Sequence, residues 1–262
     1  MPNIEPFSCR FEAKGFDCGY GGPLSPRSMA NFLQETAGEH ATRLGFGVEA
    51  LRERGLTWML SRMDLRADGL PRAAGALVAR TWPSGIERLF ALRDIELRAD
   101  GASGAPFVRG LYAYLVVDIA ARRPIRPERF FEGDPPVWEP DAGGPRHCVE
   151  SHGFRVPAAA GSVISFAQRA MPRHIDYNGH VNNAHLVDWL ADAVPRSRRG
   201  AAGSLAALRV EFLAEALEGQ DLAVSWGLPA EEPESWPEGL EALVTEIAGP
   251  SGPVARALVA WR

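Results

Sequence analysis

Apolar residues follow helical spacing in two segments of the chain. Residues 25–45 place apolar side chains three or four positions apart, which predicts a helix that buries Met29, Phe32, Leu33, Ala37 and Leu44. Ser25 and Pro26 are typical of a helix start, and Gly45 is typical of a helix end. Residues 182–195 repeat the spacing and predict a second helix with Val187, Leu190, Ala191 and Val194 on its apolar side.

The order of the predicted elements repeats along the chain. Candidate strands at residues 10–17 and 165–176 precede the two helices, and residues 61–82 and 106–114 parallel residues 208–226 and 253–261. The alignment matches Asp17 with Asp176, Asp64 with Glu211, Asp68 with Glu215 and Trp82 with Trp226. Each half therefore reads as an antiparallel sheet wrapped around one long helix, which is an α+β fold.

Proline and glycine mark the segments between these elements. Residues 124–153 are rich in both and show no period, so we expect them to link a domain of residues 1–123 to a domain of residues 154–262. A second such segment, residues 228–242, is expected to be a surface loop of the C-terminal half.

A group of polar residues precedes the second helix in the stretch HIDYNGHVNNAHLVDWL, residues 174–190. Asp176, Asn178 and His180 occupy alternate positions, and they would share one face if the backbone were extended. The first turn of the following helix is expected to present free backbone N–H groups around Val181 to Asn183, where the helix dipole favours negative charge.

Composition excludes several classes of function. A net charge of -5 does not favour nucleic-acid binding, and no apolar run approaches eighteen residues, so we expect no membrane span. The start of the sequence lacks the pattern of a secretory signal, and Cys9, Cys18 and Cys148 have no metal-site or disulfide spacing. These features favour a cytoplasmic protein. His174, His180 and His185 lack the paired spacing of a helical zinc site, so no metal or other cofactor is expected.

Longer motifs give a family resemblance. HIDYNGHVNNAHLVDWL followed by VEFLAEALEGQDL resembles the catalytic half of the acyl-acyl carrier protein thioesterases. FLQETAGEHATRLGFG, LTWMLSRMDL, ARTWP and LRDIELRADG resemble the N-terminal half of that family in the same order. The resemblance implies a tandem double hotdog that hydrolyses a fatty acyl-acyl carrier protein thioester to free fatty acid and carrier thiol.

The resemblance also implies a set of catalytic residues: Asp176, Asn178, His180 and, from the following strand, Glu215. His180 has a side chain that can take a proton near neutral pH, and Asp176 or Glu215 would orient it or act as the base. Asn178 could donate to the oxyanion or hold the water. Ala216 follows Glu215, which excludes a cysteine nucleophile at that position and favours direct attack by water.

The N-terminal half offers neither the asparagine nor the histidine of this set, so the resemblance assigns it to acyl-chain binding. Candidate substrate-binding residues there are Met29, Phe32, Leu33 and Trp58. The same residues also suit an ordinary core. His40, near the apolar face of the first helix, is expected to be a partly buried structural residue.

Other interpretations stay open. The same site would serve an acyl-coenzyme A thioesterase, a hydratase would need a related set, and a non-catalytic acyl-binding protein would need none of it. Arg196, Arg198 and Arg199 suit the end of the second helix. Alternatively they dock an acidic carrier protein, together with other arginines at positions 122, 123, 169 and 173. The acyl chain length is undetermined, and a homodimer is one option for the oligomeric state.

Overall fold

The structure is a computed structural model that describes residues 4–72, 75–101, 105–131, 135–138, 153–200 and 203–262. The chain divides into two compact units, of which the first comprises residues 1–12, 32–65 and 75–152. The second comprises residues 13–31, 66–74 and 153–262. The second unit therefore combines the C-terminal half with two short segments of the N-terminal half.

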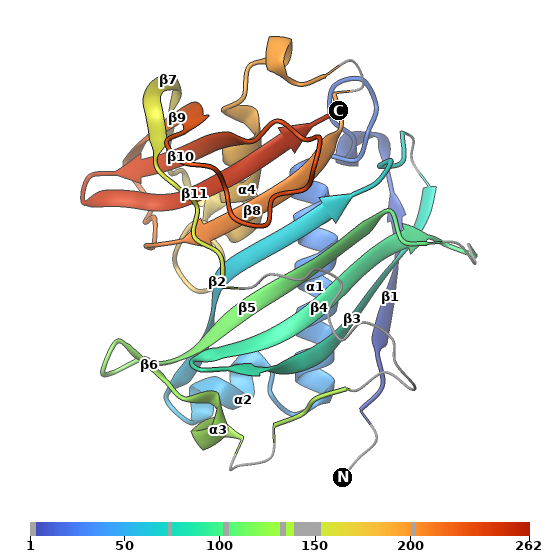
Figure 1. The fold of residues 1–262 in the computed structure, drawn as a ribbon. Helices are drawn as coiled ribbons and strands as arrows, with labels where there is room; N and C mark the ends of the chain where they lie inside the picture. Colours follow the sequence, from blue (N-terminus) through green and yellow to red (C-terminus); the bar gives the residue numbers. More distant parts are fainter. Residues whose placement is uncertain (1–3, 73–74, 102–104, 132–134, 139–152, 201–202) are drawn as a thin grey trace. The chain divides into compact units, whose positions relative to one another are not determined.

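The first unit contains five strands in the spatial order β1-β3-β4-β5-β2 (Figure 1). Their bounds are Phe7–Ala13 for β1, Leu56–Ala67 for β2, Gly75–Glu87 for β3, Phe90–Ala99 for β4 and Val108–Asp118 for β5. A short strand β6, Arg123–Ile125, pairs with β5. The helices are α1, Pro26–Arg43, which continues into this unit from the second, α2, Val48–Glu53, and α3, Pro127–Phe130.

The second unit repeats this topology. Its strands are β7, Ala159–Arg169, β8, Leu205–Phe212, β9, Asp221–Pro229, β10, Leu243–Gly249, and β11, Gly252–Trp261. They lie in the order β7-β9-β10-β11-β8, so in both units the first strand of the repeat pairs with the third and the last pairs with the second. The duplication predicted from the sequence is confirmed, and so is the α+β class.

The two predicted helices form where the apolar spacing places them. In α1 the Oγ of Ser25 accepts the N–H of Ser28 at 3.1 Å, and Gly45, with a φ of 80°, follows the helix end. Met29 and Leu33 are fully buried on its inner side. In the second unit α4, Asn183–Asp192, packs against β9, β10 and β11 and buries Val187, Leu190 and Ala191, with Val194 just beyond its end.

His40 joins α1 to the strands of the first unit, as expected for a structural residue. Its side chain is 4% exposed, and its Nδ1 lies 2.9 Å from a guanidinium nitrogen of Arg93 on β4. The same nitrogen of Arg93 donates to Thr81 on β3 at 3.3 Å. Burial, followed by the charges of Arg93 and Arg43, lowers the pKa of His40 to about 4.

The segment predicted as a linker is partly built into the core of the first unit. Its first residues form β6 and α3, and Phe130 of α3 is buried against Leu51, Leu56 and Val116. Residues 139–152 of that segment, including Cys148, lie outside the described residues, whereas Cys9 and Cys18 are free thiols. Among the described residues, no helix has both the length and the apolarity needed to cross a membrane.

Candidate active site

The predicted catalytic residues Asp176, Asn178 and His180 lie in a tight turn of the second unit. The N–H of Asp176 donates to the carbonyl oxygen of His180 at 3.0 Å, and Oδ1 of Asp176 accepts the N–H of Asn178 at 2.8 Å. Gly179 adopts a φ of 88°, a conformation that favours glycine. The expectation of an extended backbone with one polar face is therefore wrong, because the aspartate side chain closes the turn.

The helix start beside this turn is capped by Asn182, whose Oδ1 accepts the N–H of Ala184 at 2.8 Å. The N–H of Val181 donates to the carbonyl of Ala216 at 2.8 Å, and that of Asn182 donates to the carbonyl of His174 at 2.9 Å. Two of the three N–H groups expected to be free are thus occupied. The N–H of Asn183 is the one without a hydrogen bond to any described residue.

Glu215 lies in the segment after β8 and is not part of a strand, which corrects the sequence expectation. The hydrogen bond between Val181 and Ala216 joins this segment to the turn. Because His180 precedes Val181 and Glu215 precedes Ala216, the two predicted catalytic residues stand on hydrogen-bonded neighbouring segments. Asp176 and His180 are half-buried, whereas Asn178 and Glu215 are exposed.

The first half contains an equivalent loop within the same unit. Cys18 and Leu24 form an antiparallel bridge, as Ile175 and Val181 do, and the N–H of Leu24 donates to the carbonyl of Pro71 at 3.0 Å. We name residues 18–24 the first loop and residues 175–181 the second loop. Counting from the bridges, the residues of the first half that replace Asp176, Asn178, His180 and Glu215 are Gly19, Gly21, Pro23 and Leu70.

This equivalence corrects two matches of the sequence alignment. Asp17 corresponds to His174 and not to Asp176. Asp17 and His174 each end a short 3-10 helix, and their backbone carbonyls accept the N–H of the residue that precedes the long helix, α1 or α4. Asp68 does not correspond to Glu215, and its Oδ1 instead binds a guanidinium nitrogen of Arg262 at 3.2 Å. The difference between the halves is larger than predicted, because none of the four polar residues has a polar counterpart.

Two histidines that the sequence analysis weighed only as metal ligands contact one another beneath the second loop. The rings of His174 and His185 have centroids 4.8 Å apart, and Trp189 packs edge-on against His174 at 5.0 Å. Burial, then the charge of Arg27, lowers the pKa of His185 to about 4, and burial also lowers the pKa of His174. The spacing of His185 and Trp189, four residues apart on α4, indicates only that these two side chains share one face of the helix.

The candidate docking arginines differ in their contacts. Arg199 donates to the carbonyls of Val194 and Ala191 at the end of α4, which confirms the interpretation that cations suit that helix end. Arg198 pairs with Glu241 at 2.9 Å and Arg169 pairs with Asp221 at 2.9 Å. The remaining candidates of the second unit are Arg196, whose guanidinium lies 4.1 Å from the ring centre of Tyr20, and Arg173, which is exposed just before the second loop.

The candidate acyl-binding residues are well packed. Met29 and Leu33 are fully buried, Phe32 stacks on Phe11 at 4.7 Å, and Trp58 donates from its ring nitrogen to the carbonyl of Phe46 at 2.8 Å. Trp58 is also surrounded by aromatic rings of the first unit. These contacts show core packing, and an acyl-binding role remains a proposal.

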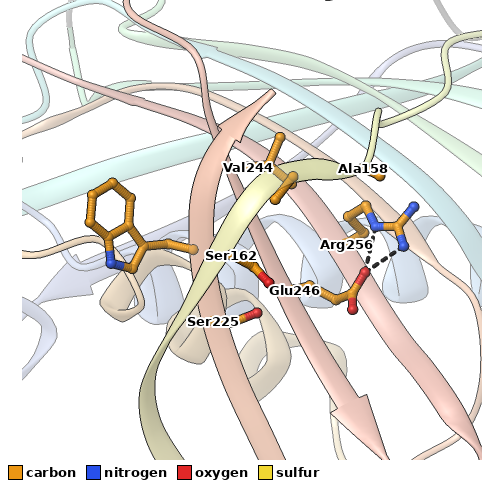
Figure 2. Close-up of a pocket in the computed structure, with 8 residues that line it drawn as sticks. Ala158, Ser162, Ser225, Val244, Glu246 and Arg256 are labelled. Carbon is orange, nitrogen blue, oxygen red and sulfur yellow. Dashed lines mark hydrogen bonds and ion pairs between the residues drawn. The ribbon is translucent and has the colours of Figure 1, made fainter. Parts of the chain in front are cut away.

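A cavity of about 170 Å³ opens elsewhere in the second unit, among β7, β9, β10 and β11 (Figure 2). Glu246 and Arg256 lie on its wall and bind one another, with Nε of Arg256 donating to Oε2 of Glu246 at 2.6 Å. Ser162 and Ser225 line the same cavity. None of the predicted catalytic residues lines this cavity, so we treat the cavity as separate from the candidate active site.

Comparison with known families decides the assignment. The acyl-ACP thioesterase N-terminal domain matches residues 5–129, and the acyl-ACP thioesterase C-terminal domain matches residues 165–241. The chain belongs to the acyl-ACP thioesterase family. Both halves of this thioesterase family are present in the order that the sequence motifs indicated.

Individual relatives of this family member are distant. The chain is 23% identical over 199 residues to oleoyl-acyl carrier protein thioesterase 1, chloroplastic, of Arabidopsis thaliana, covering 71% of this chain and 54% of the relative. It is 26% identical over 203 residues to palmitoyl-acyl carrier protein thioesterase, chloroplastic, of Gossypium hirsutum, covering 72% of this chain and 47% of the relative. The chain thus spans about half the length of the curated relatives it matches.

Solved structures of the family share the fold. An acyl-ACP thioesterase from Bacteroides thetaiotaomicron VPI-5482 superposes with a TM-score of 0.76 at 20% identity, covering 98% of each chain. The 12:0-ACP thioesterase from Umbellularia californica superposes with a TM-score of 0.75 at 19% identity, covering 98% of this chain and 97% of that one. These similarities confirm the predicted α+β hotdog fold.

Proposed function

We propose that this family member hydrolyses fatty acyl-acyl carrier protein to free fatty acid and carrier thiol, with Asp176, Asn178, His180 and Glu215 as its catalytic residues. The observation that supports this most strongly is the contrast between the two loops. Each loop has its own antiparallel bridge, its own turn and its own hydrogen bond to a neighbouring segment. Only the second loop and its neighbouring segment carry the four polar residues. A purely structural loop would not need these residues, because the first loop forms without them.

The reaction needs one water and no other reactant. The water oxygen bonds to the thioester carbonyl carbon while its proton passes to a base, and the carbonyl becomes an oxyanion. We assign the oxyanion contacts to the N–H of Asn183, beside the second loop, and to the side-chain amide of Asn178 within it. Cleavage of the carbon–sulfur bond then restores the carbonyl, and the base returns the proton to the departing thiolate.

The hydrogen bonds of the turn separate the roles of the acidic residues. Oδ1 of Asp176 holds the N–H of Asn178, so we assign Asp176 to shaping the turn. His180 and Glu215 stand on adjacent hydrogen-bonded segments, and we assign the proton transfer to this pair. The identity of the neighbouring residue, Ala216, supports attack by water and not by a cysteine.

The partner that this proposal requires is an acyl carrier protein bearing a fatty acyl chain. An acidic carrier needs accessible cations near the site. Arg173, just before the second loop, is exposed, whereas Arg169 is held in an ion pair with Asp221, so we assign docking to Arg173. Replacing Arg173 with alanine is expected to raise KM for the carrier substrate severalfold and to weaken its salt dependence. Arg169→Ala is the matched control, and an equal effect in both variants would contradict this docking position.

The division of labour between the halves, the location of the protein and its oligomeric state follow as further proposals. We propose that residues 1–123 bind the acyl chain, with Met29, Phe32, Leu33 and Trp58 lining its path, and that residues 154–262 carry the chemistry. We propose a cytoplasmic location, which suits the free thiols of Cys9 and Cys18. A homodimer is also compatible with the exposed edge strand β7.

The catalytic assignment is tested by substitution of the proposed pair. His180→Ala and Glu215→Gln are each expected to lower kcat for acyl-carrier hydrolysis by about 10²- to 10⁴-fold, the usual contribution of general acid–base catalysis. Glu218→Gln is the matched control, since Glu218 is an exposed carboxylate in the same segment. If Glu218→Gln lost as much activity as Glu215→Gln, or if neither catalytic variant lost tenfold, the assignment would be wrong.

A further inference from the structure

A 3-10 helix precedes each loop, and the side chain of its last residue accepts a hydrogen bond from the backbone N–H of the residue before that 3-10 helix. In the first half, Oδ2 of Asp17 accepts the N–H of Lys14 at 2.8 Å. In the second half, Nδ1 of His174 accepts the N–H of Met171 at 3.1 Å. The two side chains therefore perform the same backbone hydrogen bond with different chemistry.

The same side chains also connect each 3-10 helix to the long helix that follows the loop. Oδ1 of Asp17 accepts the hydroxyl of Ser28 on α1 at 2.9 Å. At the equivalent place His174 lies against His185 of α4, with ring centroids 4.8 Å apart. In both halves, therefore, a side-chain contact connects the segment before the loop to the long helix after it. In the first half this contact joins a carboxylate and a hydroxyl, and in the second half it joins two imidazoles.

We propose that His174 and His185 form a proton-sensitive latch, which holds the second loop in its turn and releases the loop when either imidazole is protonated. The inference rests on the proposed function only in so far as the second loop carries the catalytic residues. It goes beyond that function because it makes the shape of the site depend on pH.

The hydrogen bonds of His174 explain why a proton would release the loop. Its Nδ1 is an acceptor only in the neutral ring, and a proton on that atom would face the N–H of Met171. The backbone carbonyl of His174 holds the N–H of Asn182, the cap of α4. Movement of the buried His174 therefore disturbs both ends of the second loop at once.

The surroundings of the two rings disfavour positive charge on balance. Burial and nearby arginines lower the pKa of both rings, whereas a backbone hydrogen bond at Arg169, for His174, and one at Arg173, for His185, raise it by less. Arg27 of α1 and Arg173 of the 3-10 helix act on both imidazoles, and His185 stands in the first turn of α4, where the helix dipole is positive. The carboxyl one turn further along α4 is Asp188. Burial, then the charge of Asp192, raises the pKa of Asp188 to about 6, so this carboxyl gives little compensation in acid.

The direction of the pH effect follows from these charges. A released imidazole takes up a proton near its ordinary pKa of about 6.5, whereas the latched ring of His185 does so only near pH 4. The released loop therefore binds more protons throughout this range. His185 is expected to shift the equilibrium towards release by up to about tenfold per pH unit as the pH falls below 6.5, and this shift ends near pH 4. Protonation of His174 acts in the same direction.

The first loop is an internal control for this behaviour. Its fastening contains no imidazole, and imidazole is the one side chain whose ordinary pKa lies between pH 5 and 8. Lys14, Leu24 and Ser25 carry the N–H groups that correspond to those of Met171, Val181 and Asn182. Comparison of the two sets within one molecule removes global effects of acid on the protein.

Amide hydrogen exchange of the intact chain tests the latch. Between pH 7 and pH 5, after correction for intrinsic exchange, protection of residues 171–182 is expected to fall at least tenfold while that of residues 14–25 stays within about twofold. The variant His174→Asp/His185→Ser copies the first half and is expected to remove the acid response. Persistence of the response in this variant, or its absence from the native protein, would overturn the proposal.

Two further variants keep the test decisive. His174→Asn retains an acceptor for the N–H of Met171 without a titrating ring, and it is expected to reduce the acid response even if the double variant fails to fold. Asp188→Asn removes the titration of the neighbouring carboxyl and so distinguishes its effect from that of the imidazoles. Loss of the acid response in this variant alone would contradict the latch. Exchange needs no substrate, so absence of thioester hydrolysis would count against the proposed function and leave the latch result standing.

Discussion

Arg209 of β8 gives the sharpest prediction about stability. Its side chain is 1% exposed, and its guanidinium donates to the carbonyl oxygens of Glu234 and, at 2.6 Å, Ser235. The charge also lies 5.2 Å from the ring centre of Phe154 and 5.6 Å from that of Trp236. One buried cation therefore fastens the loop of residues 230–242 to the sheet of the second unit.

The cost of Arg209→Met can be built from these contacts. Methionine keeps most of the apolar packing but leaves two carbonyls without their charged donor, at about 1–3 kcal/mol for each group. The two cation–π contacts add about 0.5–2 kcal/mol each, and relief from burying the guanidinium offsets part of the sum. We expect a net loss of about 3–5 kcal/mol in the free energy of unfolding, the usual effect of removing one partner from a buried charged contact.

Urea unfolding followed by circular dichroism measures this loss, and limited proteolysis reports the release of residues 230–242. The matched control is Arg198→Met, because Arg198 forms an ion pair with Glu241 but is 43% exposed. That control is expected to lose less than about 1 kcal/mol. A loss of under about 1 kcal/mol in Arg209→Met, with the loop still resistant to protease, would refute the reasoning.

Three other predictions concern the helix start, the turn and α1. Asn182→Ala is expected to lower the free energy of unfolding by about 1 kcal/mol in urea titration because it removes the cap of α4, whereas Asn183→Ala should change it far less. Gly179→Ala should cost about 1 kcal/mol and lower kcat, because its φ of 88° strains a residue with a Cβ; an unchanged kcat would separate the turn from catalysis. His40 has its pKa lowered to about 4, chiefly by burial, so its neutral form stabilises the fold fully above pH 6.5. That contribution, at most about 3 kcal/mol, should be lost as the pH falls from 6.5 to 4, and urea titrations of His40→Phe should show a weaker dependence in this range.

Elements with strong periodicity were predictable from the sequence. Apolar spacing located α1 and α4, and the helix start predicted at Ser25 agrees with the structure. The duplication was also visible, because corresponding strands carry similar motifs in the same order. These features depend on the helix or strand preference of local residues and on which side chains are buried, and both produce a periodic pattern of apolar residues in the sequence.

The turn at the site was not predictable from alternation alone. Alternate polar residues indicate one face only on an extended backbone, and Asp176 instead captures the N–H of Asn178. The same limit explains the two-residue error in the alignment of Asp17, since the 3-10 helices before the loops have no periodic signature. The contact between His174 and His185 joins residues eleven positions apart and depends on how the loop closes.

The most direct test of the central claim is thiol release from an acyl chain presented either on acyl carrier protein or on coenzyme A. We expect the native chain to hydrolyse the carrier substrate with the higher kcat/KM, and we expect His180→Ala to lower this activity by about 10²- to 10⁴-fold. Preference for coenzyme A would contradict the assigned partner and leave the catalytic residues in place. Tight binding of the acyl carrier without any thiol release would contradict the claim itself, because it would make the chain an acyl-binding protein and not a hydrolase.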